Sequence, residues 1–286
     1  MADRTLRVAM VHQVFPGASG AEPLVATLQD CARRGAELAV LPELPLDRWA
    51  PATRDVSDAD AEESGGRRYR ELSDAARAGG LALLGGAITR ERGRRFNRGL
   101  LFDSEGRLLL GYDKLHLPSE EGFWESDHYE PGDEPPRPAS VCGFPLGLQI
   151  CSDLNRPDGS QLLVARGAEA ILAPRATPPA SFPRWRDVIR ANAITCAAYV
   201  LSTNRPAPEG DVDLGGPSLA VAPDGSVLLE STEPIGCVTL ERDAVARARA
   251  VYPGYLARPA DLYARAWRQV AREHDDASDE SDESGG

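Results

Sequence analysis

The stretch Gly-Leu-Gln-Ile-Cys-Ser-Asp-Leu-Asn-Arg-Pro, residues 147–157, joins an apolar run to a cysteine and a group of turn-forming residues. The run from Phe144 to Ile150 predicts a buried strand, and the polar residues after Cys151 predict a turn. Ligands and nucleophiles of α/β folds lie at the carboxyl ends of such strands. A thiol is also more nucleophilic at neutral pH than a hydroxyl. Cys151 is therefore a candidate nucleophile, and its alternative role is that of a small buried hydrophobic residue.

Two further predicted strands are followed by side chains that could assist a thiol nucleophile, one as a base and one as a cation. The apolar run from Ala36 to Leu41 leads into Pro-Glu-Leu-Pro, which holds Glu43 between two prolines in a stiff loop. The run from Arg107 to Tyr112 leads to Lys114, the single lysine beside 31 arginines. Lysine supplies a compact ammonium that arginine does not replace. Glu43 is a candidate general base and Lys114 a candidate cation; the alternatives are a solvated loop acid and a lysine retained by chance.

Strands and helices alternate along most of the chain. Periodicity predicts strands at 6–14, 36–41, 81–89, 97–103, 107–112, 144–150, 170–173, 199–202, 218–222, 226–229 and 236–240, and helices at 22–34, 69–78, 161–167, 181–198 and 244–249. This order favours a layered α/β sandwich whose mixed sheets are covered by helices. Two long loops, 53–68 and 119–134, interrupt the pattern, and loops of this length are often functional.

The chain divides into three predicted parts. Residues 1–243 contain no linker and are expected to form one catalytic domain, and residues 244–272 an extension that contacts another copy. Residues 273–286 carry seven acids and no lysine or arginine, so we expect a disordered tail.

Composition excludes several classes of function. More than half of the net charge of −12 belongs to the acidic tail, which argues against nucleic acid as a partner. No apolar run is long enough for a membrane-spanning helix. The five cysteines are widely spread without a Cys-x-x-Cys pair, which argues against disulfides and a zinc site and for a cytoplasmic protein. We expect neither a metal nor a cofactor.

Three segments resemble the nitrilase, or carbon–nitrogen hydrolase, superfamily. They are Leu-Pro-Glu ending at Glu43, Tyr-Asp-Lys-Leu-His-Leu-Pro around Lys114, and Gln-Ile-Cys-Ser-Asp around Cys151. Their order and their separations of 71 and 37 residues also fit that family. Weaker similarities lie at Asn97 and at Glu125, ahead of Tyr-Glu-Pro-Gly-Asp. The resemblance covers residues 5–243.

This resemblance implies a fold and a reaction. The fold is an αββα sandwich that dimerises into four layers, and the reaction is hydrolysis of a non-peptide C–N bond through a thioester. Cys151 would attack the amide carbon while Glu43 transfers protons. Lys114, with the backbone N–H after Cys151, would stabilise the oxyanion. Glu125 resembles the family's second glutamate, which positions substrate and supports Lys114.

The chain departs from the family after the cysteine. Many members have Arg-Phe-Pro or Arg-Trp-Pro after Cys-x-Asp, whereas this chain has Leu-Asn-Arg-Pro at 154–157. The usual substrate contacts are therefore not carried over. Candidate substrate contacts are Trp124, Ser152 and Asn155, and Trp124 with its neighbouring acids favours a cationic or amphipathic amide such as an N-carbamoyl amine. His116 and Asp153 are expected to be structural, and the other cysteines to be ordinary buried thiols.

These observations together predict a cytoplasmic hydrolase of a small linear amide or N-carbamoyl compound. We expect a homodimer or larger even assembly in which residues 256–272 reach across. Two alternatives are a nitrilase that converts a nitrile to acid and ammonia, and a binding protein that keeps the fold without the chemistry. The presence of all three catalytic residue types argues against the second.

Overall fold

Two mixed β-sheets and the helices that cover them make up the first unit of the chain, which ends at Gly254. The computed structural model describes residues 5–17 and 20–283, with side chains up to residue 273. Within these residues every helix is too short or too polar to cross a membrane.

The first sheet has the strand order β13-β1-β2-β4-β5-β6, with the short β3 paired to β4. Its strands are β1 (Thr5–Val11), β2 (Leu38–Val40), β3 (Glu62–Glu63), β4 (Ala82–Glu91), β5 (Arg94–Phe102), β6 (Leu108–Asp113) and β13 (Ile235–Glu241). Strands β1, β2 and β4 are parallel, because α1 (Ala21–Arg33) and α2 (Arg67–Gly79) cross over between them. The outer strands pair antiparallel.

The second sheet repeats this design with the order β12-β11-β10-β9-β8-β7. Its strands are β7 (Ala139–Val141), β8 (Phe144–Leu148), β9 (Ala170–Leu172), β10 (Tyr199–Ser202), β11 (Ser218–Val221) and β12 (Val227–Ser231). The central three are parallel and are connected through α4 (Pro157–Ala165) and α5 (Phe182–Cys196). The mixed sheets predicted from the sequence are thus present twice.

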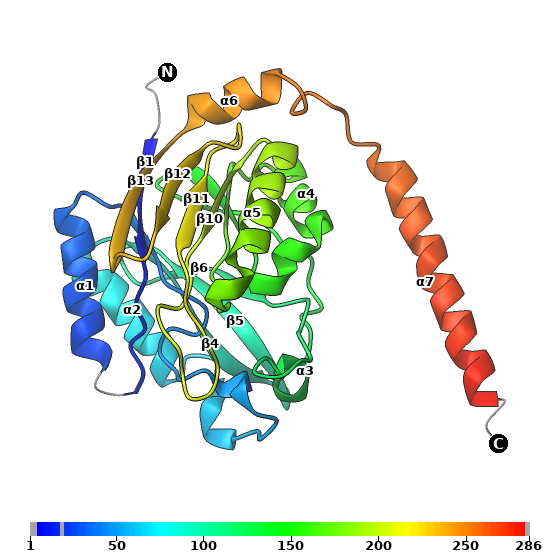
Figure 1. The fold of residues 1–286 in the computed structure, drawn as a ribbon, viewed down its shortest axis with the longest axis horizontal. Coiled ribbons are helices and arrows are strands. Elements are labelled where there is room, and N and C mark those ends of the chain that lie inside the picture. Colours follow the sequence, from blue (N-terminus) through cyan, green and yellow to red (C-terminus); the bar gives the residue numbers. More distant parts are fainter. Residues whose placement is uncertain (1–4, 18–19, 284–286) are drawn as a thin grey trace. The chain divides into compact units, whose positions relative to one another are not determined.

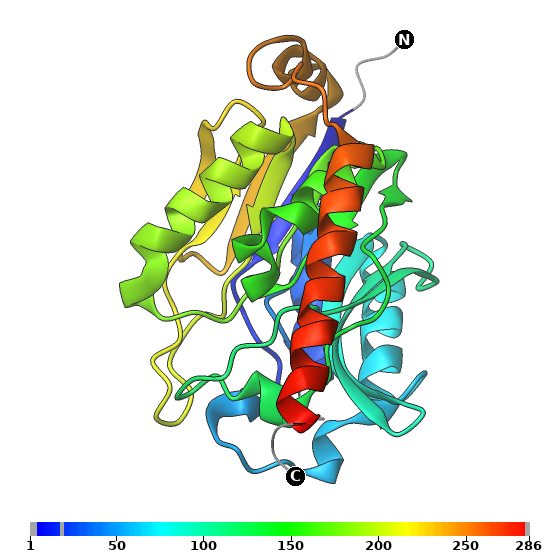
Figure 2. The same cartoon turned by 90° about the vertical axis from the view of Figure 1, so that its right-hand side faces the viewer.

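The sheets face each other, and each carries its helices on the outer face. In Figure 1, α1 and α2 lie on one side and α4 and α5 on the other, and Figure 2 looks onto the side that carries α4 and α5. The core between the sheets includes Leu38 and Leu84 from the first sheet and Phe144 and Leu172 from the second. A separate cluster lies beneath each helix pair. The predicted αββα sandwich follows from this order of layers.

Helix α2 shows how local sequence sets the packing. It ends at Gly80, whose φ of 67° is the left-handed conformation that glycine adopts readily at a helix C-terminus. Its buried Leu72 faces Gly85 in β4, where an added Cβ would meet the leucine side chain at 2.5 Å. The glycine therefore lets the helix approach the sheet closely.

The first unit of the chain extends beyond residue 243, where the sequence predicts the end of the catalytic domain. Helix α6 (Arg242–Ala250) continues directly from β13, and its Val245 and Ala248 are buried. It therefore belongs to the first unit, which extends to Gly254 rather than ending at residue 243.

Short helices also interrupt the loops: η2 (Ala50–Ala52), η3 (Asp58–Asp60), α3 (Glu125–His128), η4 (Cys151–Asn155) and η5 (Pro179–Ser181).

The second unit, Tyr255–Gly286, contains helix α7 (Ala260–Glu283). The sequence predicts disorder from residue 273, whereas the structure continues α7 to Glu283, and residues 284–286 lie outside the described part. Residues 260–272 are rich in alanine, leucine and arginine, which form helices well. Once a helix has started, each added residue extends it at little further cost, so the acidic residues continue it.

Candidate active site

Cys151 lies at the sharp turn between β8 and η4. Its φ of 45° is in the left-handed region, which is costly for a residue with a Cβ. Its N–H donates to the carbonyl of Pro174 at 2.9 Å, and its Sγ lies 3.9 Å from the carbonyl oxygen of Ala176. The side chain is buried, with 5% of its surface exposed. The backbone thus fixes the thiol at the end of a buried strand, where the sequence places a nucleophile.

Asp153 joins the Cys151 turn to the loop that carries Lys114. Its carboxylate accepts hydrogen bonds from the N–H of Ile150 at 3.0 Å and from the hydroxyl of Tyr112 at 2.8 Å. It also accepts bonds from the backbone and the Nδ1 of His116, at 3.0 and 2.8 Å. The structural roles that the sequence predicts for Asp153 and His116 agree with these contacts.

The loop that carries Glu43 is held by Arg205. Glu43 follows β2, and the next residue, Leu44, has a φ of 47°. The fully buried guanidinium of Arg205 donates to the carbonyls of Glu43 and Leu44 at 2.7 and 2.8 Å and pairs with Glu209 at 2.5 Å. These bonds hold a strained loop in one conformation, so the Glu43 carboxylate is positioned before any substrate enters.

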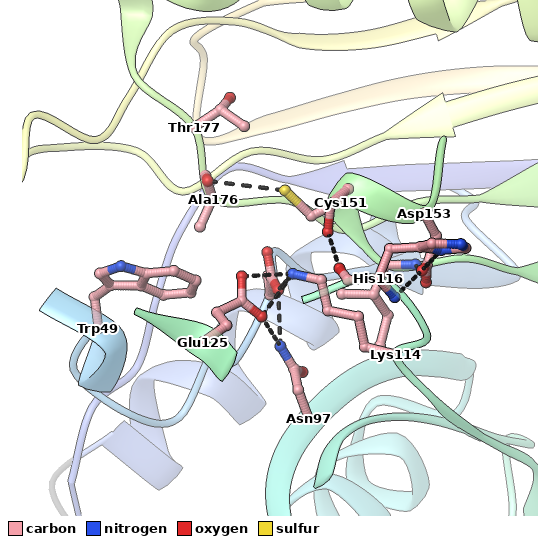
Figure 3. A network of polar contacts seen from close by, with 12 residues as sticks. Trp49, Asn97, Lys114, His116, Glu125, Cys151, Asp153, Ala176 and Thr177 are labelled. Atoms are coloured by element: carbon pink, nitrogen blue, oxygen red, sulfur yellow. Dashed lines mark hydrogen bonds and ion pairs between the residues drawn. The ribbon is translucent and has the colours of Figure 1, made fainter. Parts of the chain in front are cut away.

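Lys114 brings two carboxylates together. Its Nζ lies 2.8 Å from Glu43 Oε1 and 2.6 and 2.7 Å from the two oxygens of Glu125. The Asn97 amide donates to Glu43 Oε1 at 2.8 Å and to Glu125 Oε2 at 3.4 Å. Figure 3 shows the ammonium directed at Glu125 and the Cys151 sulfur directed at Ala176. Glu43, Lys114 and Glu125, which lie far apart in the sequence, thus form one fully buried cluster.

Burial and charge shift the protonation of this cluster. Burial alone would lower the pKa of Lys114, but Glu125 and Glu43 outweigh it and raise the pKa, so the ammonium stays charged. Burial raises the pKa of Glu125 to about 7, against the opposing effect of Lys114. Burial, reinforced by Glu43, raises the pKa of the Cys151 thiol, so the resting nucleophile carries its proton. A base must therefore remove this proton during attack.

One oxygen of Glu43 is available for that proton. Glu43 Oε1 is bound by Lys114 and Asn97, whereas Oε2 is buried and has no hydrogen-bond partner among the residues that the structure describes. Buried carboxylate oxygens are normally paired, so an unpaired one beside a protonated thiol fits a general base.

A cavity of about 220 Å³ opens above the cluster. Cys151, Glu125, Ser152 and Asn155 all line it. Its other walls are Pro118, Glu120, Phe123, Ala176, Thr177, Pro178, Ser181, Arg184 and Trp185. The cavity is large enough for a small organic molecule and is walled by both aromatic and polar groups.

The family follows from comparison with known proteins. A family model for carbon–nitrogen hydrolases matches residues 12–250. The chain belongs to the carbon–nitrogen hydrolase family. The family and the enzyme class that the sequence predicts are thereby confirmed.

Several relatives of this carbon–nitrogen hydrolase carry names. A protein of Pseudomonas protegens, described as a hydrolase in the pqqF 5′ region, is 32% identical over 91% of this chain and 91% of its own. Human omega-amidase NIT2 is 29% identical over 83% of this chain and 88% of its own. Human deaminated glutathione amidase is 30% identical over 82% of this chain and 76% of its own.

Solved structures share the fold. A carbon–nitrogen hydrolase from Helicobacter pylori has a TM-score of 0.83 and 19% identity, over 92% of this chain and 99% of that one. An amidase from a Nesterenkonia species has a TM-score of 0.72 and 26% identity, over 92% of this chain and 96% of that one. The α/β sandwich predicted for this hydrolase is therefore confirmed.

Trp124, a candidate substrate contact from the sequence, is not among the residues that line the cavity of this hydrolase. Arg54 lies over its indole ring, 3.7 Å from the ring centroid, and the cavity is lined instead by its neighbour Phe123 and by Trp185. Because α3 starts at Glu125, the chain turns there and directs successive side chains to different surfaces. Trp185 lies in α5, and periodicity alone did not show that this end of the helix faces the cavity.

The structure also shows where the other four cysteines lie. Cys31 and Cys196 are buried as expected, whereas Cys142 is exposed and Cys237 half-buried. Cys142 lies in the turn between β7 and β8, with a φ of 48°. In the part of the hydrolase that the structure describes, no group of three or more histidine, cysteine or acidic side chains could hold a metal ion.

Proposed function

We propose that this carbon–nitrogen hydrolase cleaves a small linear amide or N-carbamoyl compound through a Cys151 thioester and releases ammonia or an amine. The observation that carries the proposal is the buried Lys114 ammonium bound to Glu43 and Glu125 beneath the cavity that contains the Cys151 thiol. The relatives named as amidases support amide hydrolysis as the reaction class.

In the first half of the reaction Cys151 is acylated. The thiol gives its proton to Glu43 Oε2 as the sulfur forms a bond to the amide carbon, and the carbonyl π electrons move to the oxygen. All three Lys114 protons have carboxylate acceptors in the resting site, so Lys114 stabilises this oxyanion through its charge. The Ser152 N–H lies in the first turn of η4, where N–H groups lack an acceptor within the helix, and it donates a hydrogen bond to the oxyanion.

In the second half the thioester is hydrolysed. The oxyanion collapses, the C–N bond breaks, and the leaving nitrogen takes the proton from Glu43. A water molecule then gives a proton to Glu43 as its oxygen attacks the thioester carbon. Collapse of this second oxyanion breaks the C–S bond, and the thiolate regains its proton from Glu43 as the acid leaves.

The cavity supports a small substrate. Ser152 and Asn155 line it beside the thiol, so we assign them to the substrate carbonyl side, while Phe123 and Trp185 offer apolar walls. A reduced thiol is needed for this chemistry, and five widely spread cysteines without a Cys-x-x-Cys pair fit a cytoplasmic location.

Release of ammonia from a panel of amides, N-carbamoyl compounds and nitriles would test the proposal. We expect turnover of an amide or N-carbamoyl compound by the wild-type protein and none by Cys151→Ala. If only nitriles were turned over, the protein would be a nitrilase and not an amidase. If Cys151→Ala turned over substrate as fast as the wild type, Cys151 would not be the nucleophile. A folded wild type that binds compounds of the panel without turning them over would favour a binding protein.

A further inference from the structure

Arg175 is a fully buried cation that has no counter-ion among the residues described by the structure. It follows β9, and none of its side-chain surface is exposed. Its Nη2 donates to the carbonyl of Pro217, whereas its Nε and Nη1 have no acceptor within the described part of the chain. The other fully buried arginine, Arg205, is paired with Glu209. Buried charges in proteins are normally paired, so the unpaired guanidinium of Arg175 calls for a physical explanation.

The groups that face Arg175 carry no negative charge in the resting protein. The ring of Phe182 lies 5.8 Å from its guanidinium carbon. Burial and the charge of Arg175 lower the pKa of His12, so this imidazole is neutral at physiological pH. Burial also lowers the pKa of Arg175, to about 10, which leaves the guanidinium protonated at neutral pH.

Arg175 belongs to the backbone segment that contacts Cys151. Its two neighbours in the chain, Pro174 and Ala176, supply the carbonyls that contact the N–H and the sulfur of Cys151. Figure 3 shows the contact between Ala176 and the sulfur. Opposing the effect of burial, negative charge on Cys151 raises the pKa of Arg175. In the resting protein Arg175 has no negatively charged partner among the described residues. Cys151 would supply that negative charge during the reaction.

The charges on the other side of Cys151 do not favour a thiolate. The titratable groups that face it there are Glu43, Lys114 and Glu125. When all three are ionised, the two carboxylates outnumber the single ammonium. A further negative charge on sulfur is then opposed by the cluster, unless a second cation lies nearby.

We propose that Arg175 is a positioning residue of this hydrolase, whose buried guanidinium stabilises negative charge on Cys151 Sγ during attack. The part that Arg175 plays in amide hydrolysis rests on the proposed function, whereas its stabilisation of a Cys151 thiolate does not. The guanidinium acts through the field across the Pro174–Ala176 segment and does not touch the substrate, since it does not line the cavity. Because it has no carboxylate partner, its positive charge is not neutralised locally.

The pH dependence of Cys151 alkylation by iodoacetamide tests this directly. The thiolate displaces iodide and forms a thioether, so the rate follows the thiolate population. The full-length protein would be compared with Arg175→Met, Arg175→Gln and Arg175→Lys, and mass spectrometry of the Cys151 peptide would separate this reaction from that of exposed Cys142. Cys151→Ala gives the background.

We expect Arg175→Met and Arg175→Gln to shift the profile upward by about one pH unit, with alkylation about tenfold slower below the midpoint. Arg175→Lys, which keeps the charge, should stay near the wild type. Thermal unfolding should show Arg175→Met at least as stable as the wild type, because a buried unpaired cation is replaced by an apolar side chain.

Several outcomes would overturn the proposal. A wild-type profile in folded Arg175→Met or Arg175→Gln would show that the charge does not act on Cys151. A folded Arg175→Lys that behaves like Arg175→Met would show that charge is not the determinant, and failure of all three variants to fold would assign Arg175 to stability. Absence of amide turnover in the wild type, with the alkylation profile shifted as expected, would instead count against the proposed function alone.

Discussion

At the scale of single residues, the two oxygens of Glu43 have different environments. Oε1 is bound by Lys114 and Asn97, and Oε2 is unpaired among the described residues. Glu43→Gln would keep the size of the side chain and an acceptor for Lys114 but could not accept the thiol proton. We expect kcat to fall by about 10²–10⁴-fold in steady-state assays, and activity within a factor of two of the wild type would contradict the assignment.

Two tryptophans test the position of the substrate. Trp185 lines the cavity, whereas Trp124 is covered by Arg54 and does not. We expect Trp185→Ala to raise KM about tenfold, which corresponds to roughly 1.4 kcal/mol of lost contact. Trp124→Ala is the matched control and should change KM less. A larger rise for Trp124→Ala would return that residue to the substrate site.

The sequence predicted the site residues that combine a reactive side chain with a position just after a predicted strand. Glu43, Lys114 and Cys151 each follow an apolar run, so both signals were readable. Trp185 and Arg175 gave no such signal, because the direction in which a side chain points depends on how its element packs. Trp124 lies outside the cavity lining and stacks on Arg54; the sequence did not show this, because an aromatic residue in a polar loop is equally compatible with a substrate wall and with stacking on an arginine.

At the scale of elements, the turn after β8 depends on Asp153. Its carboxylate binds donors from β6, from the Lys114 loop and from its own turn. Asp153→Asn removes the negative charge. It also places the N–H donors of the asparagine amide against groups that themselves donate hydrogen bonds. We expect a loss of about 2 kcal/mol in urea unfolding together with reduced kcat. Asp187→Asn, on the exposed face of α5, is the control; equal stability of the two variants would contradict this role.

Helix α3 carries Glu125, whose protonation links stability to pH. Its pKa of about 7 in the folded chain exceeds its ordinary value of 4.5, so the folded state holds a proton that the unfolded state has lost between these values. This contribution is complete below pH 4.5 and is lost as the pH rises to about 7. Urea unfolding across this window should show the wild type losing stability with pH relative to Glu125→Gln. Parallel curves would contradict this, and Glu121→Gln, an exposed acid of the same loop, should follow the wild type.

Element boundaries were predicted less well than element types. Periodicity found every strand that leads to Glu43, Lys114 or Cys151, but it did not show that α6 packs on β13 or that α7 continues through the acidic residues. Both depend on what lies beside or before the segment: burial of Val245 and Ala248 in one case, and an existing helix to extend in the other.

At the scale of the whole molecule, the site draws on both sheets. Glu43 and Lys114 follow β2 and β6 of the first sheet, and Cys151 follows β8 of the second. The distance between Glu43 and Cys151 is therefore set by the packing of sheet on sheet. Asp153 adds a direct bond across this boundary through Tyr112 of β6. Substitutions in the core between the sheets should thus affect catalysis before they unfold the protein.

Helix α7 leads to a prediction about assembly. Leu262, Tyr263, Trp267 and Val270 are exposed, Trp267 by 59%, and large apolar residues that recur along one helix face mark an interface. We propose that residues 256–272 contact a second copy, which makes the protein a homodimer or larger even assembly. Light scattering of the full chain should give an even multiple of the 30.7 kDa chain, and the pair Tyr263→Glu and Trp267→Glu should lower it. Arg268→Glu, a charge change on the same helix, is the control. A monomeric wild type would contradict the proposal, and an even assembly that survives the paired substitutions would place the interface elsewhere.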